Sequence, residues 1–241
     1  MMRLSIVAWL MLAGAAFAAD RLMPEPSVFA GDDFTREYDA MVVSALADAY
    51  SADVKVRAVV FPSFRTEYAI GLKEKQSSYV AFCLRPELQL WGYETLKMMK
   101  AGSIKNITTG GPVDQERDKR DVAKLEASLP ASFRDVPIIA GEIPLERDVA
   151  LRLVDLWEAM LRQTRYDREV GIGFDGVTYH FSMRSGNQDL AGQVWSPAPE
   201  STTGLLVRIV ETLRHLCDGR AQSIGVQLRV QADELHARLV R

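Results

Sequence analysis

Residues 67–84 read EYAIGLKEKQSSYVAFCL, and this stretch decides the fold class. Two runs of strand character, Glu67–Lys73 and Ser78–Leu84, flank the polar residues 74–77, a pattern typical of antiparallel strands joined by a tight turn. Residues 54–61, VKVRAVVF, have the same character and come just before. The three runs predict an antiparallel meander. Because both faces of the run Ser78–Leu84 are apolar, we expect that strand to be covered.

Two helices are predicted from apolar residues that recur three and four positions apart. The first spans residues 33–50, and Asp32 or Asp33 can cap it. The second spans Pro144–Arg165, with proline at the first helical position. We expect the apolar face of the second helix to cover the sheet, through Val149, Leu153, Trp157, Met160 and Leu161.

The C-terminal third predicts two further helices. One begins with Glu200, Ser201 and Thr202 and stops at Asp218-Gly219. The last segment, residues 224–239, fits both a helix and a strand. We favour the helix because residues 232–239 are good helix formers.

The middle of the chain is the least regular part. A short strand is predicted over Leu88–Trp91, followed by a helical turn over residues 94–100. Residues 101–135 hold most of the loop signals, so we expect a mobile excursion there. The whole pattern predicts a single α+β domain over residues 19–241, an antiparallel meander sheet covered on one face by helices.

The N-terminus has the pattern of a secretory signal peptide. Arg3 precedes the apolar run Leu4–Gly14, and Ala16-Phe17-Ala18 places small residues where signal peptidase needs them. Residues 1–18 are therefore predicted to be removed, which leaves a soluble, exported protein in the periplasm or outside the cell. An uncleaved anchor and a buried helix are the alternatives. The charged, proline-bearing residues 20–26 argue against both, so we expect no stable membrane anchor after cleavage.

Charge and cysteine content narrow the function classes. The chain has 241 residues and a formal net charge of −3. That balance gives no support to nucleic-acid binding, which requires a basic excess. Cys83 and Cys217 are the two cysteines, and export permits a disulfide between them if the helix carrying Cys217 packs on the strand carrying Cys83. The alternative is two buried free thiols.

Residues 171–176, the glycine motif GIGFDG, match the G-x-G-x-x-G pattern of dinucleotide-binding loops in residue type, but not in the structure predicted around them. The fingerprint requires a helix after the glycines. Here VTYHFSM follows at residues 177–183 and alternates as a strand does, so Asp175-Gly176 is interpreted as a hairpin turn.

That strand supplies the candidate binding face. Alternation places Thr178, His180, Ser182 and Arg184 on one side, opposite the apolar residues. A partner strand over residues 190–195 ends in Trp195, which we expect beside His180 at the rim of a groove. The alternative is an ordinary solvent-facing sheet surface.

Catalytic and metal signatures are missing from the sequence. It contains no G-x-S-x-G elbow, no S-x-x-K and no H-E-x-x-H, and the three histidines lack metal-ligand spacing. We therefore expect no metal and no cofactor, and we name no catalytic set. The favoured hypothesis is a non-catalytic periplasmic module that binds a protein or a small envelope ligand. The alternative is a cell-envelope hydrolase with a cleft centred on His180.

Signal cleavage is directly testable. If the full chain is expressed in a bacterial host, N-terminal sequencing of the exported protein is expected to start at Ala19. An Ala18→Leu variant should accumulate unprocessed, because the enzyme's subsite accepts only small side chains. Export of a chain that still begins at Met1 would contradict this prediction.

Overall fold

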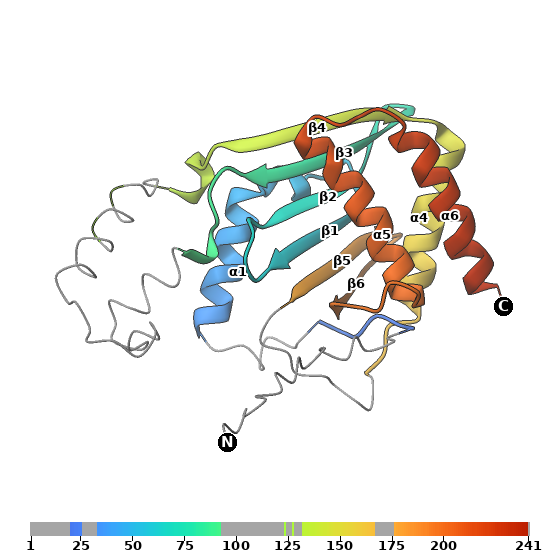
Figure 1. Cartoon of the computed structure of the whole chain (residues 1–241), viewed down its shortest axis with the longest axis horizontal. Coiled ribbons are helices and arrows are strands. Elements are labelled where there is room, and N and C mark those ends of the chain that lie inside the picture. The colour runs from blue at the N-terminus through green and yellow to red at the C-terminus, as the bar shows by residue number, and fades with distance from the viewer. Residues whose placement is uncertain are drawn as a thin grey trace, which may run out of the picture.

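The computed structural model describes residues 20–25, 33–92, 123, 127, 132–166 and 176–240. These ranges contain one antiparallel sheet of six strands in the order β4-β3-β2-β1-β5-β6 (Figure 1). The strands are β1 Val54–Pro62, β2 Tyr68–Lys75, β3 Ser78–Pro86, β4 Ile138–Leu145, β5 Val177–Ser185 and β6 Gln188–Trp195. The helices are α1 Asp33–Ala45, α4 Arg147–Arg162, α5 Thr202–Arg214 and α6 Ile224–Leu239, with the 3-10 turns η1 Ala47–Tyr50, η2 Phe133–Asp135 and η3 His215–Asp218. The predicted α+β class is confirmed.

The predicted meander is present as β1, β2 and β3, and β4 continues it to one edge of the sheet. The turn between β2 and β3 consists of Gln76 and Ser77, and Gln76 takes the left-handed conformation with φ 59°. The hairpin β5–β6 joins the other side of β1, where Val59 lies opposite His180. Strand β1 is thus hydrogen-bonded on both sides.

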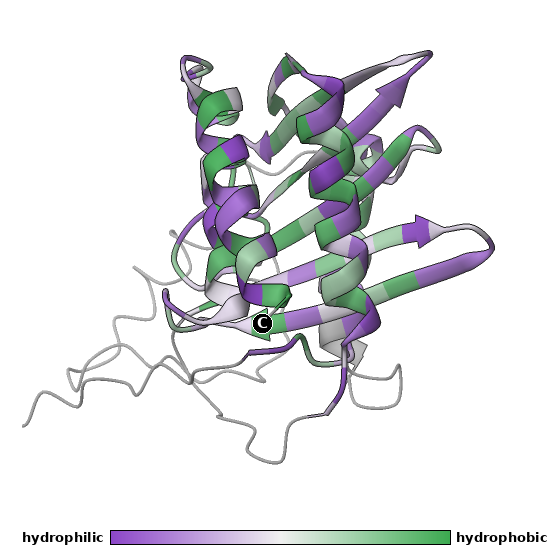
Figure 2. Cartoon of the chain, turned by 90° about the vertical axis from the view of Figure 1, so that its right-hand side faces the viewer, coloured by the Kyte–Doolittle hydropathy of each residue, from purple (hydrophilic) through white to green (hydrophobic). Residues whose placement is uncertain are grey.

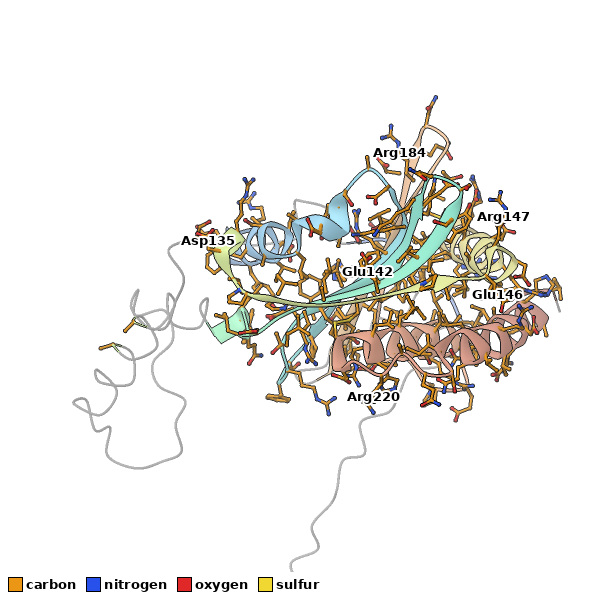
Figure 3. The ribbon with its side chains drawn as sticks, turned by 90° about the horizontal axis from the view of Figure 1, so that it is seen from above. Asp135, Glu142, Glu146, Arg147, Arg184 and Arg220 are labelled. Atoms are coloured by element: carbon orange, nitrogen blue, oxygen red, sulfur yellow. A yellow bond between two sulfur atoms is a disulfide. The ribbon has the colours of Figure 1, made fainter. Side chains whose placement is uncertain are left out.

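Helices lie on both faces of the sheet, whereas the sequence predicted them on one face, because the central strands carry buried side chains on both sides. Helices α4, α5 and α6 pack on one face, against side chains such as Ala58, Ile70 and Cys83. Helix α1 packs on the other face, against Val59, Ala69 and Phe82. Seen from above, α1 lies on one side of the sheet and α5 and α6 lie on the other (Figure 3). Hydrophobic and hydrophilic residues alternate along the strands and around the helices (Figure 2), as two-sided packing requires.

The helix predictions hold in most details. Ser201 caps α5 by accepting a hydrogen bond from the Gly204 amide, and Gly219, with φ 69°, ends the 3-10 turn η3 that follows it. The ambiguous last segment is the helix α6, which buries Ile224, Leu228, Ala232 and Leu235. All five residues predicted for the apolar face of the second helix are buried in α4.

Two boundary predictions are wrong. Pro144 does not begin a helix; it lies in β4 opposite Val80, and α4 starts at Arg147. Proline is tolerated there because β4 is an edge strand, whose outer side needs no amide partner. Leu88–Trp91 is not a strand, since helical backbone begins at Trp91. The amides of Leu90 and Trp91 donate to the Glu67 carboxylate instead of to a strand.

Several predictions lie outside the described residues. These are the signal peptide at residues 1–18, the helical turn at 94–100, nearly all of the excursion at 101–135 and the hairpin turn that includes Asp175. Strand β5 nevertheless begins at Val177, directly after Gly176. A strand therefore follows the glycine motif where a dinucleotide site would need a helix.

Cys83 of β3 and Cys217 of η3 form a disulfide, with Sγ atoms 2.06 Å and Cα atoms 5.4 Å apart. The bond closes a sequence separation of 134 residues. It ties the end of the C-terminal helical layer to the sheet, as expected if the helix packs on the strand.

Replacing both cysteines by alanine should lower the free energy of unfolding by about 2–5 kcal/mol, because the unfolded chain regains the entropy of a long open loop. Urea denaturation with and without a reductant measures this. The reductant should lower the urea midpoint of the wild type to that of the double variant and leave the midpoint of the variant unchanged. Equal midpoints for wild type and variant would contradict the prediction.

A buried carboxylate joins α1 to the sheet. Glu67 has no exposed surface, and it accepts hydrogen bonds from the hydroxyl of Tyr38, from the Leu90 amide at 2.9 Å and from the Trp91 amide at 2.9 Å. Burial and the neighbouring Glu67 charge raise the pKa of Tyr38, which keeps its hydroxyl a donor. Tyr38 also packs edge-on against Phe61 and Trp91.

A Glu67→Gln variant should lose about 2–3 kcal/mol of stability, because its amide group would face backbone donors and leave buried groups unpaired. Tyr38→Phe, which removes one donor, should lose about 1 kcal/mol. Urea denaturation compares both with Glu87→Gln, a change on an exposed glutamate. A Glu67→Gln midpoint equal to that of the control would refute the role of the buried carboxylate.

Candidate functional site

Strand β5 presents the predicted two faces. Tyr179, Phe181 and Met183 are buried in the core under the helices. On the other face Thr178, His180 and Ser182 are partly exposed and Arg184 is exposed. Figure 3 places Arg184 on the hairpin β5–β6, on the same side of the sheet as α1.

Strand pairing fixes how the candidate residues lie. Thr178 is opposite Trp195, and His180 is opposite Gln193 on β6 and Val59 on β1. Trp195 is therefore diagonal to His180 across the β5–β6 ladder. The five candidates Thr178, His180, Ser182, Arg184 and Trp195 share one face of the sheet.

Three of these five residues line a cavity of about 570 Å³ on this face: His180, Ser182 and Arg184. Thr178 and Trp195 do not line it. The opposite wall comes from α1 and η1, through Asp39, Val43 and Tyr50, and Arg57 and Phe61 of β1 contribute to the sheet side. The structure thus places the cavity where α1 meets the open face of β5 and β6.

His180 has an aromatic and an acidic neighbour. Its ring centroid lies 4.8 Å from that of Phe61, and its Nδ1 lies 3.5 Å from Oε1 of Glu25. Asp39 lies within electrostatic reach: burial raises the pKa of its carboxyl, the His180 charge lowers it and the Glu25 charge raises it. One imidazole and two carboxylates from three parts of the chain therefore share the cavity.

An N-terminal strap, residues 20–25, carries Glu25 to this place. Met23 forms two backbone hydrogen bonds with Gln193 of β6, of 2.8 and 2.7 Å. Leu22 is completely buried, and its carbonyl accepts from the Arg165 amide at 3.0 Å. The strap is thus bonded to the edge strand at Met23, and Glu25 is its last residue.

The far end of the cavity carries a stacked cation. The guanidinium of Arg57 lies 4.0 Å from the centre of the Tyr50 ring. Burial raises the pKa of Tyr50, and Arg57 opposes that shift. Arg57 faces Ser182 across the β1–β5 ladder, and Arg184 faces Asp189 across the β5–β6 ladder. Charges of both signs and the aromatic rings of Phe61 and Tyr50 line the cavity.

The geometry limits the chemistry available. In the described ranges, no hydrogen bond joins His180 to a hydroxyl or thiol that would act as a nucleophile. Nor do the described residues contain three or more His, Cys, Asp or Glu side chains grouped to hold a metal ion. What the cavity offers is fixed charges, aromatic surface and the His180–Asp39 pair.

Sequence reasoning missed Glu25, Asp39, Tyr50, Arg57 and Phe61. Alternation along β1 puts Arg57, Val59 and Phe61 on one face, so the sequence indicates that these three belong together. Nothing local connects them to His180, because strand order decides which strand lies beside β5. Glu25 and Asp39 reach the cavity only through the strap and through the docking of α1.

None of the helices in the described part of the chain has the length and hydropathy of a membrane span. Comparison of the chain with protein-family models, with curated proteins and with solved structures finds no match.

Proposed function

We propose that this protein is an exported binding protein that holds a small polar envelope ligand in the His180 cavity. The cavity itself carries the proposal, since it is concave, half apolar and lined by a few charged groups, as small-molecule sites commonly are. Fixed charges of both signs suit a ligand that itself carries a cationic and an anionic group.

Three of the cavity's charged groups, Arg57, Glu25 and Asp39, are available to such a ligand. Arg57 is held in place by the Tyr50 ring, so little side-chain freedom is lost when its guanidinium binds an anion. Glu25 and Asp39, which line the same cavity, offer carboxylates to a cation. Lys55 is already paired with Glu74 at 2.5 Å, so it contributes less.

Export is supported by two independent features. The Cys83–Cys217 disulfide is typical of proteins that fold outside the cytosol. The apolar N-terminal segment has the composition of a signal peptide. Asp20, the second residue of the predicted mature chain, accepts hydrogen bonds from the Thr202 amide and hydroxyl, both at 3.4 Å, so this residue of the predicted mature chain packs on the domain.

One observation favours a second candidate, a cell-envelope hydrolase. Asp39 and His180 interact electrostatically in a cavity, and the pKa of Asp39 is raised by burial. A carboxyl with a raised pKa beside an imidazole is a common acid–base arrangement. In that function Asp39 would act as the acid and His180 as the base that activates water.

The test is to export the full chain with its own N-terminal segment, purify it and identify co-purifying small molecules by mass spectrometry. We expect one ligand in near-stoichiometric amount. His180→Ala and Arg57→Gln should each reduce it about tenfold, because each removes a polar contact with the ligand. His236→Ala, a change on an exposed histidine of α6, is the matched control.

The same samples distinguish the alternatives. Equal ligand in the His180→Ala variant and the control, or none in any sample, would refute the binding proposal. A protein partner captured by the wild type and lost in His180→Ala would make this face a protein interface instead. Turnover of ester, peptide or glycan substrates that is lost in Asp39→Asn would establish the hydrolase.

A further inference from the structure

A second cavity, of about 720 Å³, lies on the other face of the sheet. It is lined by the β1–β2 loop at Ser63–Thr66, by Arg85 and Glu87 at the end of β3, and by Glu211 and Arg214 of α5. Tyr68 and Tyr179 of the helix-covered core also line it. It shares no lining residue with the His180 cavity.

A fixed polar cluster is part of its wall. Oε1 of Glu211 accepts hydrogen bonds from the hydroxyls of Tyr68 at 2.6 Å and Tyr179 at 3.1 Å. Oε2 of Glu211 accepts from Nε of Arg214 at 2.9 Å. Burial, reinforced by the Glu211 charge, raises the pKa of both tyrosines, so they remain donors. Glu211 is thus fixed by two tyrosine hydroxyls and by an ion pair with Arg214.

Three arginines from three elements converge on the cavity: Arg65, Arg85 and Arg214. Arg85 and Arg214 are oriented by the two oxygens of Asp218, at 3.1 and 3.3 Å. Arg65, in the β1–β2 loop, makes no side-chain hydrogen bond or ion pair within the described residues. Two carboxylates line the cavity as well, but Glu211 is already engaged, which leaves the exposed Glu87. The three guanidinium groups in the cavity lining thus have more hydrogen-bond donors than the two carboxylates in that lining can accept.

Apolar surface lies beside these cations. Phe64, next to Arg65 in the loop, is 77% exposed. Pro62, Pro86 and Ile139 also line the cavity. A ligand that covers this exposed phenyl ring removes apolar surface from water, which favours binding.

We propose that this cavity is a second binding site, for a small ligand that carries a carboxylate or phosphate group on an aromatic or other apolar body. Arg65 binds the anionic group together with the guanidinium nitrogens of Arg85 and Arg214 that make no hydrogen bond to another described residue, and Phe64 packs on the body. Planar guanidinium groups match both anions by paired hydrogen bonds.

Calorimetric titration of the full chain with phenylacetate, phenyl phosphate and inorganic phosphate tests the site. We expect at least one aromatic probe to bind, with the preferred probe identifying a carboxylate or a phosphate ligand. Inorganic phosphate should bind more weakly because it lacks the apolar body. Arg65→Gln should weaken binding about tenfold and Phe64→Ala about fivefold.

Both substitutions lie on an exposed loop, so the fold should be unaffected, and thermal unfolding verifies this. Arg238→Gln, a change on an exposed arginine of α6 that lines neither cavity, is the control and should bind like the wild type. Failure of both aromatic probes to bind, or equal affinity in Arg65→Gln and the control, would overturn the proposal. Neither result depends on the His180 cavity, so the two proposals fail separately.

Discussion

The central strands bury side chains on both faces, and this requirement determines where the helices lie. Neighbours along β1, β2 and β3 point to opposite layers: Ala58 and Ile70 face α4–α6, whereas Val59, Ala69 and Phe82 face α1. Burying apolar area on both sides is the main source of stability for such a sheet. Helices α4, α5 and α6 cover only one face of the sheet, so α1 is needed to cover the other. The Glu67 carboxylate then fixes that helix through the Tyr38 hydroxyl.

The His180 cavity follows from where this coverage stops. The apolar cluster under α1 includes residues of β1, β2 and β3 but, among the described residues, none of β5 or β6. The second face of the β5–β6 hairpin therefore carries polar side chains at the border of the core, and the strap at residues 20–25 pairs with its edge. A polar face beside a packed helix leaves a concave surface, and the strap adds Glu25 to it. The candidate site is thus a consequence of incomplete coverage rather than of a local motif.

What the sequence predicts well is local in origin. Alternating polar and apolar residues predict β1–β3 and β5, and apolar residues three and four positions apart predict α4 and α6. Each pattern follows from the face that the element buries. Strand β4, IIAGEIPL, escaped prediction because its Gly141 and Pro144 weaken the strand signal. The tertiary structure explains both residues. A Cβ on Gly141 would lie 2.1 Å from the Leu216 carbonyl oxygen, and Pro144 is tolerated because β4 is an edge strand. The site was predicted only along β5, since Glu25 and Asp39 reach His180 through contacts that no local pattern encodes.

The two cavities are linked by one strand yet are expected to act independently. Tyr179 and His180 are neighbours in sequence, but alternation sends the first to the Glu211 cavity and the second to the Glu25 cavity. Coupling between them would require β5 to shift or twist. Strand β5 is hydrogen-bonded along its length to β1 and to β6, and the disulfide holds the end of the C-terminal helical layer on the sheet. We therefore expect a ligand on one face to leave the affinity on the other unchanged, because coupling would require a second arrangement of β5.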